Sequence, residues 1–223
     1  LVVMESELCA AHATVAGIKN VIALRGSDGI KPSFAKRISR AGCNKVVFLY
    51  DTETDEKKKK DIHSKITRAI TGLREVAANI HIRVATIPEE LNAKDPDELI
   101  QKDPALWQAA VQKSVPAVDW LLKKYEESVD LSSAPGKRKY SDIALKLLGY
   151  IKDEVERASY EEKVAKKLDV DVKILREKGE RLNKKLEQGD IVEILTSKNQ
   201  TPKTSWLGKI FTAHARQKLI HQL

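Results

Sequence analysis

Cysteine is scarce in this sequence, and its spacing suits neither a metal site nor a disulfide framework. Cys9 and Cys43 are the two cysteines among 223 residues. Neither belongs to a C-x-x-C pair, which argues against a structural zinc site, and two thiols do not make a disulfide framework. Cysteine usage therefore favours a reducing, cytoplasmic compartment.

Long apolar runs are also missing. No stretch approaches the ~20 residues that a membrane-spanning helix needs, and no signal peptide is recognisable, so we expect no membrane partner. The sequence has no Walker loop, no G-x-G-x-x-G turn and no Ser/His/Asp arrangement. These absences argue against a P-loop nucleotide-binding protein, a dinucleotide-binding protein and a serine hydrolase.

Positive charge is in excess. Lys and Arg number 40 against 32 for Asp and Glu, the net charge is +8 and the pI is about 9.3. Such a balance favours a polyanionic partner, and nucleic acid is the first candidate. Hydrophobic residues make up 42% of the chain, which is enough for one good core or two modest ones.

Four short apolar stretches have the composition of buried strands: residues 1–4, 21–24, 45–50 and 80–84. Helix-forming segments separate them, and the connections are too long for hairpins. Alternating strands and helices predict an α/β domain with a four-stranded parallel sheet, Rossmann-like, covered by helices on both faces. The first strand is already in progress at Leu1 with no initiator Met, so we expect the chain to be a fragment.

From about Pro104 the pattern changes to helices alone. A break is expected near residues 132–136, followed by helices over 140–155 and 160–168 and a short one over 169–177. The last segment changes again, because a Gly-Asp turn lies between two apolar runs and a final helix follows Pro202. This tail has the pattern of a strand pair plus a helix.

Acidic side chains follow three of the four expected strands, at the point where each strand ends. They are Glu5, Glu7, Asp51, Glu53, Asp95 and Asp97. Ligands of an open parallel sheet bind beyond the carboxyl ends of its strands, so these groups are expected to converge on one edge. A hard divalent cation relieves the repulsion between clustered carboxylates. The pattern therefore predicts a site for Mg²⁺ (or Mn²⁺) that serves phosphoryl transfer. Solvated acidic turns are the alternative for all three groups, and above all for residues 51–53 taken alone.

Several of these phrases resemble the Toprim domain of bacterial replicative DNA primases. Residues 5–8 (ESEL) and 16–27 (AGIKNVIALRGS) are similar to the opening of that domain, where a glutamate ends the first strand. In the family a D-x-D pair ends the third strand and a D-P-D loop follows the next. Residues 51–53 (DTE) and 95–97 (DPD) stand here in that order. The helices after Pro104 resemble the helical end of the primase polymerase domain.

The resemblance implies roles for individual residues. Glu5 is expected to be a general acid/base or a metal ligand, and the catalytic set would be Glu5, Asp51 and Glu53. The metal set would be Glu5, Asp51, Glu53, Asp95 and Asp97. Lys19 and Arg25 are candidates for phosphate contacts, with a solvated surface charge as the alternative for each.

The sequence departs from the family pattern at the expected site. The family has E-G-x-x-D after its first strand, but here Ser6 replaces the glycine and Cys9 stands where the aspartate belongs. A thiol is a poor ligand for Mg²⁺. Glu53 replaces the second aspartate of D-x-D, and the Ala-Gly that normally follows is absent. The family's zinc ribbon and basic amino-terminal subdomain are missing too, so we expect the chain alone to bind metal and nucleotide weakly and to make little primer.

The tail resembles another family. Residues 182–198 and 202–207 are similar to the second half of a TGS domain of the bifunctional alarmone synthetase/hydrolase family. That domain is regulatory in the family, and it senses tRNA or ribosome state. We therefore expect a partial, β-grasp-like α+β tail that could contact RNA. A genuine fusion and a chimera of two reading frames both remain open.

These patterns and resemblances predict three domains: a Toprim catalytic domain (1–105), a helical primase subdomain (106–178) and a partial TGS-like tail (179–223). The leading hypothesis is a DNA primase fragment that condenses ribonucleoside triphosphates on single-stranded DNA, with a replicative helicase as a further partner. One alternative is a Toprim nuclease or topoisomerase-like strand cleaver. Another is a non-catalytic nucleic-acid-binding or regulatory module of the TGS type.

Overall fold

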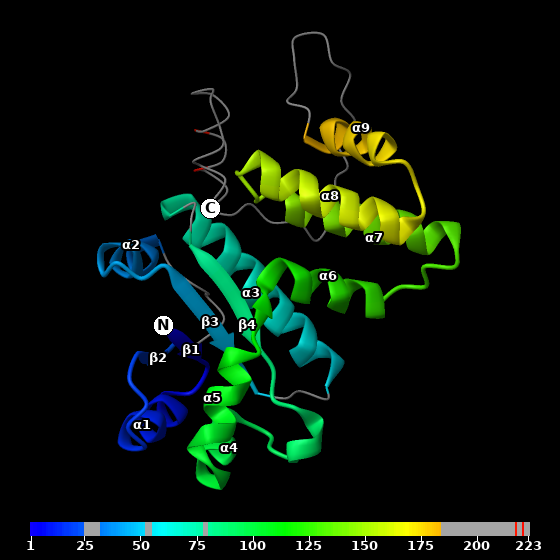
Figure 1. Ribbon diagram of the computed structural model, residues 1–223. Coiled ribbons are helices and arrows are strands. Elements are labelled where there is room, and N and C mark those ends of the chain that lie inside the picture. Colours follow the sequence, from blue (N-terminus) through cyan, green and yellow to red (C-terminus); the bar gives the residue numbers. More distant parts are fainter. Residues whose placement is uncertain (25–31, 52–54, 78–79, 184–216, 218–219, 221–223) are drawn as a thin grey trace. The chain divides into compact units, whose positions relative to one another are not determined.

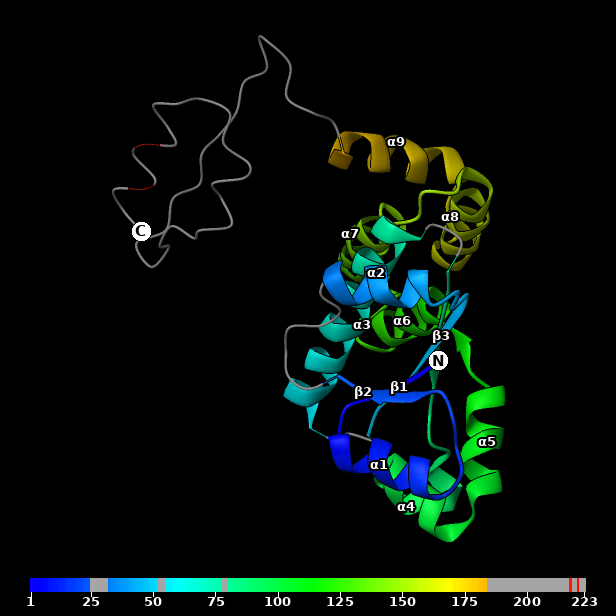
Figure 2. The ribbon, with the colours of Figure 1, turned by 90° about the vertical axis from the view of Figure 1, so that its left-hand side faces the viewer.

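The structure, a computed structural model, describes residues 1–24, 32–51, 55–77, 80–183, 217 and 220. The chain divides into two compact units, Leu1–Lys184 and Lys185–Leu223. Nearly all described residues belong to the first unit (Figures 1 and 2). The strand pair expected in the tail lies outside the described residues, so the TGS-like tail remains a prediction.

The sheet of the first unit has five strands in the order β2-β1-β3-β4-β5. They are β1 (Val2–Met4), β2 (Val21–Ala23), β3 (Lys45–Leu49), β4 (His81–Ala85) and β5 (Val115–Pro116). The first four are parallel, as the sequence predicts, and β5 pairs antiparallel with β4. The prediction of four strands was thus one short, because a two-residue strand containing a proline has no readable alternation.

Helices and one 3-10 turn connect and extend this sheet. They are α1 (Glu7–Val15), α2 (Pro32–Arg40), α3 (Glu56–Val76), η1 (Glu89–Leu91), α4 (Pro96–Lys102), α5 (Pro104–Gln112), α6 (Ala117–Glu127), α7 (Ala134–Leu148), α8 (Glu154–Leu168) and α9 (Val172–Asn183). Figure 2 shows α1 and α4 on one side of β1 and β2, with α2 and α3 on the other. None of the described helices combines the length and apolarity that crossing a membrane would need.

The two faces of the sheet build two separate cores. Val46 and Phe48 of β3 pack into a large core with the apolar side of α3 and residues of α6 to α9. Val47 and Leu49, which alternate with them, pack into a smaller core with residues of α1, α4 and α5. Side chains of successive strand residues point to opposite faces, so a strand buried at every position needs cover on both sides. The prediction of helices on both faces is confirmed.

In the helical region, residues 117–183 (α6 to α9), several helices begin or end at other residues than the sequence predicts. The expected break at 132–136 is the start of α7, since the Ser133 Oγ accepts a hydrogen bond from the Gly136 N–H at 3.1 Å and Pro135 is tolerated in a first turn. The helix expected over 140–155 ends at Leu148. The next begins at Glu154, six residues before the predicted start, because Asp153 caps it.

Candidate functional site

The parallel register brings the ends of β1 and β3 to the same edge of the sheet. Val3 lies opposite Phe48, so Glu5, which follows β1, and Asp51, which follows β3, leave the sheet on the same side. Both side chains are half-buried. We call this side, with Glu5, Asp51, Asp95 and Asp97, the carboxylate edge.

Asp95 and Asp97 begin α4, in the segment that follows β4. Asp95 is the N-cap, and its Oδ1 accepts a hydrogen bond from the Glu98 N–H at 2.8 Å. Asp97 lies in the first turn and faces α1, where its Oδ1 is 2.5 Å from His12 Nδ1. Its Oδ2 accepts a hydrogen bond from Gln101 at 2.9 Å. Both carboxylates thus have structural partners within the fold.

Cys9 lies buried beside these carboxylates. It belongs to the first turn of α1, where the Ser6 Oγ caps the helix by accepting from the Cys9 N–H at 3.5 Å. Burial raises the pKa of the Cys9 thiol, and the negative charges of Asp95 and Asp51 raise it further. The hydrogen bond from Ser6 lowers this pKa in part. The charges of Asp51 and Asp95 therefore both act on one thiol, at the position where the resembled family has an aspartate.

Glu5 is paired with a lysine on the long helix α3. Lys65 Nζ donates to Glu5 Oε1 at 2.7 Å and is 2.9 Å from Asp61 Oδ2. Burial alone would lower the pKa of Lys65, but the hydrogen bonds and charges of Glu5 and Asp61 together raise it above its usual value. Burial, followed by the charges of the same two acids, also raises the pKa of Tyr50, which keeps its phenol protonated.

The donor chemistry at the carboxylate edge fits a hard divalent cation, since the side chains are carboxylates. The arrangement of the described residues is more open: no three Asp, Glu, His or Cys side chains among them gather closely enough to hold a metal ion. Glu53 and Arg25, two of the predicted site residues, lie outside the described residues. The metal site therefore stays a prediction.

Lys19 is placed apart from the carboxylates. It is exposed and lies before β2, so it is at the amino end of the parallel strands, whereas the carboxylate edge is at their carboxyl ends. A phosphate contact by Lys19 remains a prediction, and it would involve a different part of the surface from Glu5 and Asp51.

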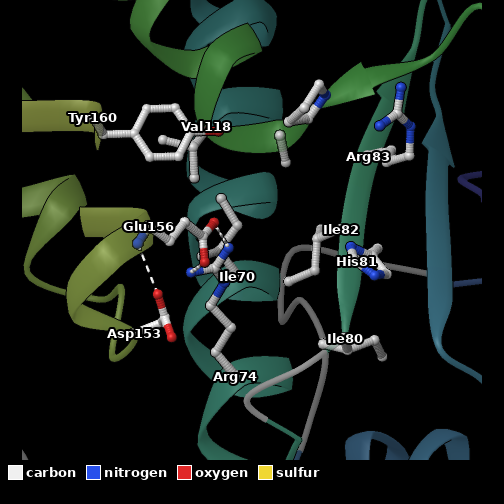
Figure 3. A pocket seen from close by; sticks show the side chains of 12 residues that line it. Ile70, Arg74, Ile80, His81, Ile82, Arg83, Val118, Asp153, Glu156 and Tyr160 are labelled. Atoms are coloured by element: carbon white, nitrogen blue, oxygen red, sulfur yellow. Dashed lines mark hydrogen bonds and ion pairs between the residues drawn. The ribbon is translucent and has the colours of Figure 1, made fainter. Parts of the chain in front are cut away.

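A second feature is a cavity of about 530 Å³ between β4, α3, α6 and α8 (Figure 3). Arg74 and Glu156 meet across it, with Arg74 Nη2 2.6 Å from Glu156 Oε1 and Nη1 3.2 Å from Oε2. Arg83 reaches from β4 to Ser114, where its Nε donates to the hydroxyl at 3.1 Å. Asp153, also at this cavity, accepts a hydrogen bond from the Glu156 N–H at 2.7 Å. Arg74, Arg83, Asp153 and Glu156 thus all have partners within the fold, so the cavity has the character of a seam between the sheet and the helical region.

Comparison with known proteins points to DNA primases. A family model described as the DnaB-helicase binding domain of primase matches residues 118–172. This segment falls within the helical region and covers most of α6 to α8. No curated protein sequence matches the chain.

Solved structures similar to this one are primase catalytic cores. A structure of the DnaG catalytic core aligns with a TM-score of 0.64 and 23% identity over 78% of this chain and 54% of that one. A DNA primase domain from Pseudomonas aeruginosa gives 0.65 and 18%, over 79% and 53%. A DnaG primase catalytic domain bound to single-stranded DNA gives 0.64 and 22%, over 78% and 52%. The chain has this fold and spans about half the length of the structures it matches.

Sequence reasoning missed two residues of the carboxylate edge. Lys65 is one turn after Asp61 on α3, a spacing that signals an ion pair along a helix, but its contact with Glu5 joins positions 60 residues apart. His12 has no metal-ligand spacing in the sequence, yet it pairs with Asp97 across 85 residues. No local pattern reports either long-range contact.

Proposed function

We propose that this chain is the catalytic part of a DNA primase, which joins ribonucleotides into RNA primers on single-stranded DNA. The observation that carries the proposal is the carboxylate edge on a fold shared with DnaG catalytic cores. The net charge of +8 suits a nucleic-acid partner. The first 105 residues would be the Toprim domain and residues 106–178 the helical subdomain.

Primer extension needs one proton transfer and one displacement at phosphorus. The 3′-hydroxyl of the primer attacks the α-phosphorus of a ribonucleoside triphosphate, a new P–O bond forms, and pyrophosphate leaves. Glu5 is our candidate to accept the hydroxyl proton, because it follows β1 at the carboxylate edge and Lys65 holds its Oε1 in place. Lys19 and Arg25 remain candidates for contacts with phosphates.

Asp51, Asp95 and Asp97 are the described residues that, with Glu5 and Glu53, would hold Mg²⁺ or Mn²⁺. When bound, such an ion would neutralise the charge of the phosphates and help to stabilise the transition state. The partners of Asp95 and Asp97 would help to position these two metal ligands. The cap hydrogen bond and the His12 contact fix both carboxylates at the start of α4. Cys9 in place of an aspartate would weaken the ion's hold.

The helical region supplies a candidate partner surface. Residues 118–172 match the helicase-binding family of primases, and we propose a replicative helicase of the DnaB type as the partner. The TGS-like tail adds a possible RNA contact, which is proposed on sequence grounds alone.

The test is to titrate Mg²⁺ into wild type and Asp51→Ala and to measure primer synthesis and DNA nicking, with and without an added amino-terminal primase half. We expect primer synthesis that falls by about 100-fold or more in Asp51→Ala, because metal-site carboxylates control both affinity and rate. The exposed acid Glu75, near the end of α3, gives the control Glu75→Ala, which should leave synthesis unchanged. Equal synthesis in wild type and Asp51→Ala would reject the proposal.

The structure bears differently on the two alternative functions. A strand-cleaving enzyme of the topoisomerase type needs a nucleophilic tyrosine, but burial and nearby negative charge raise the pKa of Tyr50, which counts against that residue. A non-catalytic module is favoured by one observation: Glu5 and Asp97 are already paired with Lys65 and His12 inside the fold. Absence of Mg²⁺ binding in both proteins of the titration would support the non-catalytic reading.

A further inference from the structure

Lys65 is the one buried charged residue in the part of the chain that the structure describes. Its relative exposure is 8%, and the other buried polar residues there are Ser114 and Ser141. A lysine is rarely buried unless its ammonium is paired. Its neighbours on α3, Ile62 and Ile66, are apolar core residues, so an aliphatic side chain would suit the packing at this position.

The pairing partners of Lys65 tie α3 to the carboxylate edge. Glu5 comes from the end of β1 and Asp61 from the preceding turn of α3, and both carboxylates contact the same ammonium, at 2.7 and 2.9 Å. The side chain of Lys65 is 9% exposed, against 36% for Glu5 and 46% for Asp61. The ammonium is thus shielded by the fold, while the two acids reach toward solvent.

A buried ion pair is weak evidence for stability, because well-packed apolar residues often do as well. The charge at Lys65 is therefore better explained by its effect on Glu5 than by its contribution to folding. It immobilises one oxygen of a flexible glutamate, and it places a positive charge directly beside the carboxylates of Glu5 and Asp61.

We infer that Lys65 is a positioning residue that holds Glu5 through Oε1 and acts as a built-in counter-charge, lowering the affinity of the carboxylate edge for divalent cations. The inference rests on the proposed Mg²⁺-dependent function and names a regulator of that site. A divalent cation that binds at this edge must share Glu5 with the ammonium or displace it, so the lysine sets the metal concentration that the site responds to.

The test is the affinity for Mn²⁺ alone, measured by electron paramagnetic resonance on the whole chain without nucleotide or DNA. Lys65→Met keeps the length of the side chain and removes its charge, and we expect Mn²⁺ to bind about tenfold more tightly, because one repulsive charge next to the ion is gone. Lys65→Arg should stay within about twofold of wild type, since it retains the charge. The control is Lys178→Met, which removes a comparable ion pair with Asp142 in the helical region and should leave the affinity unchanged.

The outcomes separate this inference from the proposed function. Equal or weaker binding in Lys65→Met than in wild type overturns the inference and leaves the metal site standing. Binding that appears only in Lys65→Met supports the inference and rejects a working metal site in the native chain. No binding in either protein overturns both.

A second measurement covers the case in which Lys65→Met does not fold. In wild type with ¹⁵N-labelled lysine, the side-chain nitrogen resonance of Lys65 should shift when Mg²⁺ is added, while that of Lys178 should not. Lys65 signals that stay in place up to saturating Mg²⁺ would overturn the inference.

Discussion

Different kinds of contact stabilise the carboxylate edge and the helical region. In the helical region, local sequence signals determine much of the structure, because Ser133 and Asp153 cap α7 and α8 and apolar residues recur along each helix. At the carboxylate edge, the decisive contacts join residues far apart in sequence, such as Glu5 with Lys65 and His12 with Asp97. The difference teaches that the edge is specified by the tertiary fold, and the changes below test that contrast.

The largest effect is expected from opening the core of the helical region. Leu148 is 1% exposed at the end of α7, and Leu148→Ala should lower the free energy of unfolding by about 2–5 kcal/mol, because it leaves a cavity. Urea denaturation followed by circular dichroism measures the change. Val155→Ala is the matched control, since Val155 is 80% exposed and should change stability by less than about 0.5 kcal/mol.

The long-range pair between α3 and α8 should come next. Glu156→Ala leaves Arg74, whose side chain is 11% exposed, without its carboxylate partner, and we expect a loss of about 2 kcal/mol after allowing for the partial exposure of Glu156. Glu127→Ala, which breaks an exposed pair with Lys124, should cost at most about 0.5 kcal/mol. Similar losses in the two variants would show that the seam depends on packing and not on this ion pair.

The helix caps offer a direct comparison of the two regions. Asp153 and Asp95 accept the same kind of hydrogen bond, at 2.7 and 2.8 Å, so alanine at either position should cost about 1 kcal/mol. Asn caps nearly as well as Asp but carries no charge. Asp95→Asn should therefore keep the stability and weaken Mn²⁺ binding, whereas Asp153→Asn should change neither. Unchanged Mn²⁺ affinity in Asp95→Asn would show that Asp95 caps α4 and is not a metal ligand.

The smallest effect should appear in the titration of the tyrosines. Burial, with a contribution from Glu126, raises the pKa of Tyr140 to about 12, while the raised pKa of Tyr50 depends in part on Glu5. In Glu5→Gln the pKa of Tyr50 should move down, and that of Tyr140 should stay. Absorbance at 295 nm against pH, with Tyr50→Phe to assign the signal, measures both pKa values. An unmoved pKa of Tyr50 would show that Glu5 does not contribute to it.

The same groups predict how stability responds to alkali. A tyrosine with a raised pKa in the fold stays neutral at a pH where the same tyrosine in the unfolded chain has begun to ionise. Its contribution to the free energy of unfolding is therefore full below the ordinary pKa of 10 and is lost as pH rises toward the folded pKa. Lys65, with its raised pKa, acts in the same direction above 10.5. The free energy of unfolding should therefore fall from about pH 10 upward, and Tyr140→Phe should make that decline shallower. A steeper or equal decline in that variant would contradict the assignment.

Much of the fold could be predicted from residue patterns. Four parallel strands and helices on both faces follow from the apolar stretches, because strand and helix periods differ. The antiparallel β5 and the start of α8 could not be predicted: β5 has only two residues, and Asp153 was not recognised as a cap. At the carboxylate edge, the acids could be named in advance because they follow strand ends. Their partners Lys65 and His12 could not, since they come from helices that only packing brings near.

By itself, the sequence determined the alternation of strands and helices, the positive charge of the chain and the positions of acids at the ends of strands. These depend on local periodicity and composition. The tertiary structure alone decided that the charges of Asp51 and Asp95 act on Cys9 and that Lys65 pairs with Glu5 inside the fold. Such contacts depend on how separate elements pack, and a buried ammonium exists only where the fold supplies carboxylates to meet it.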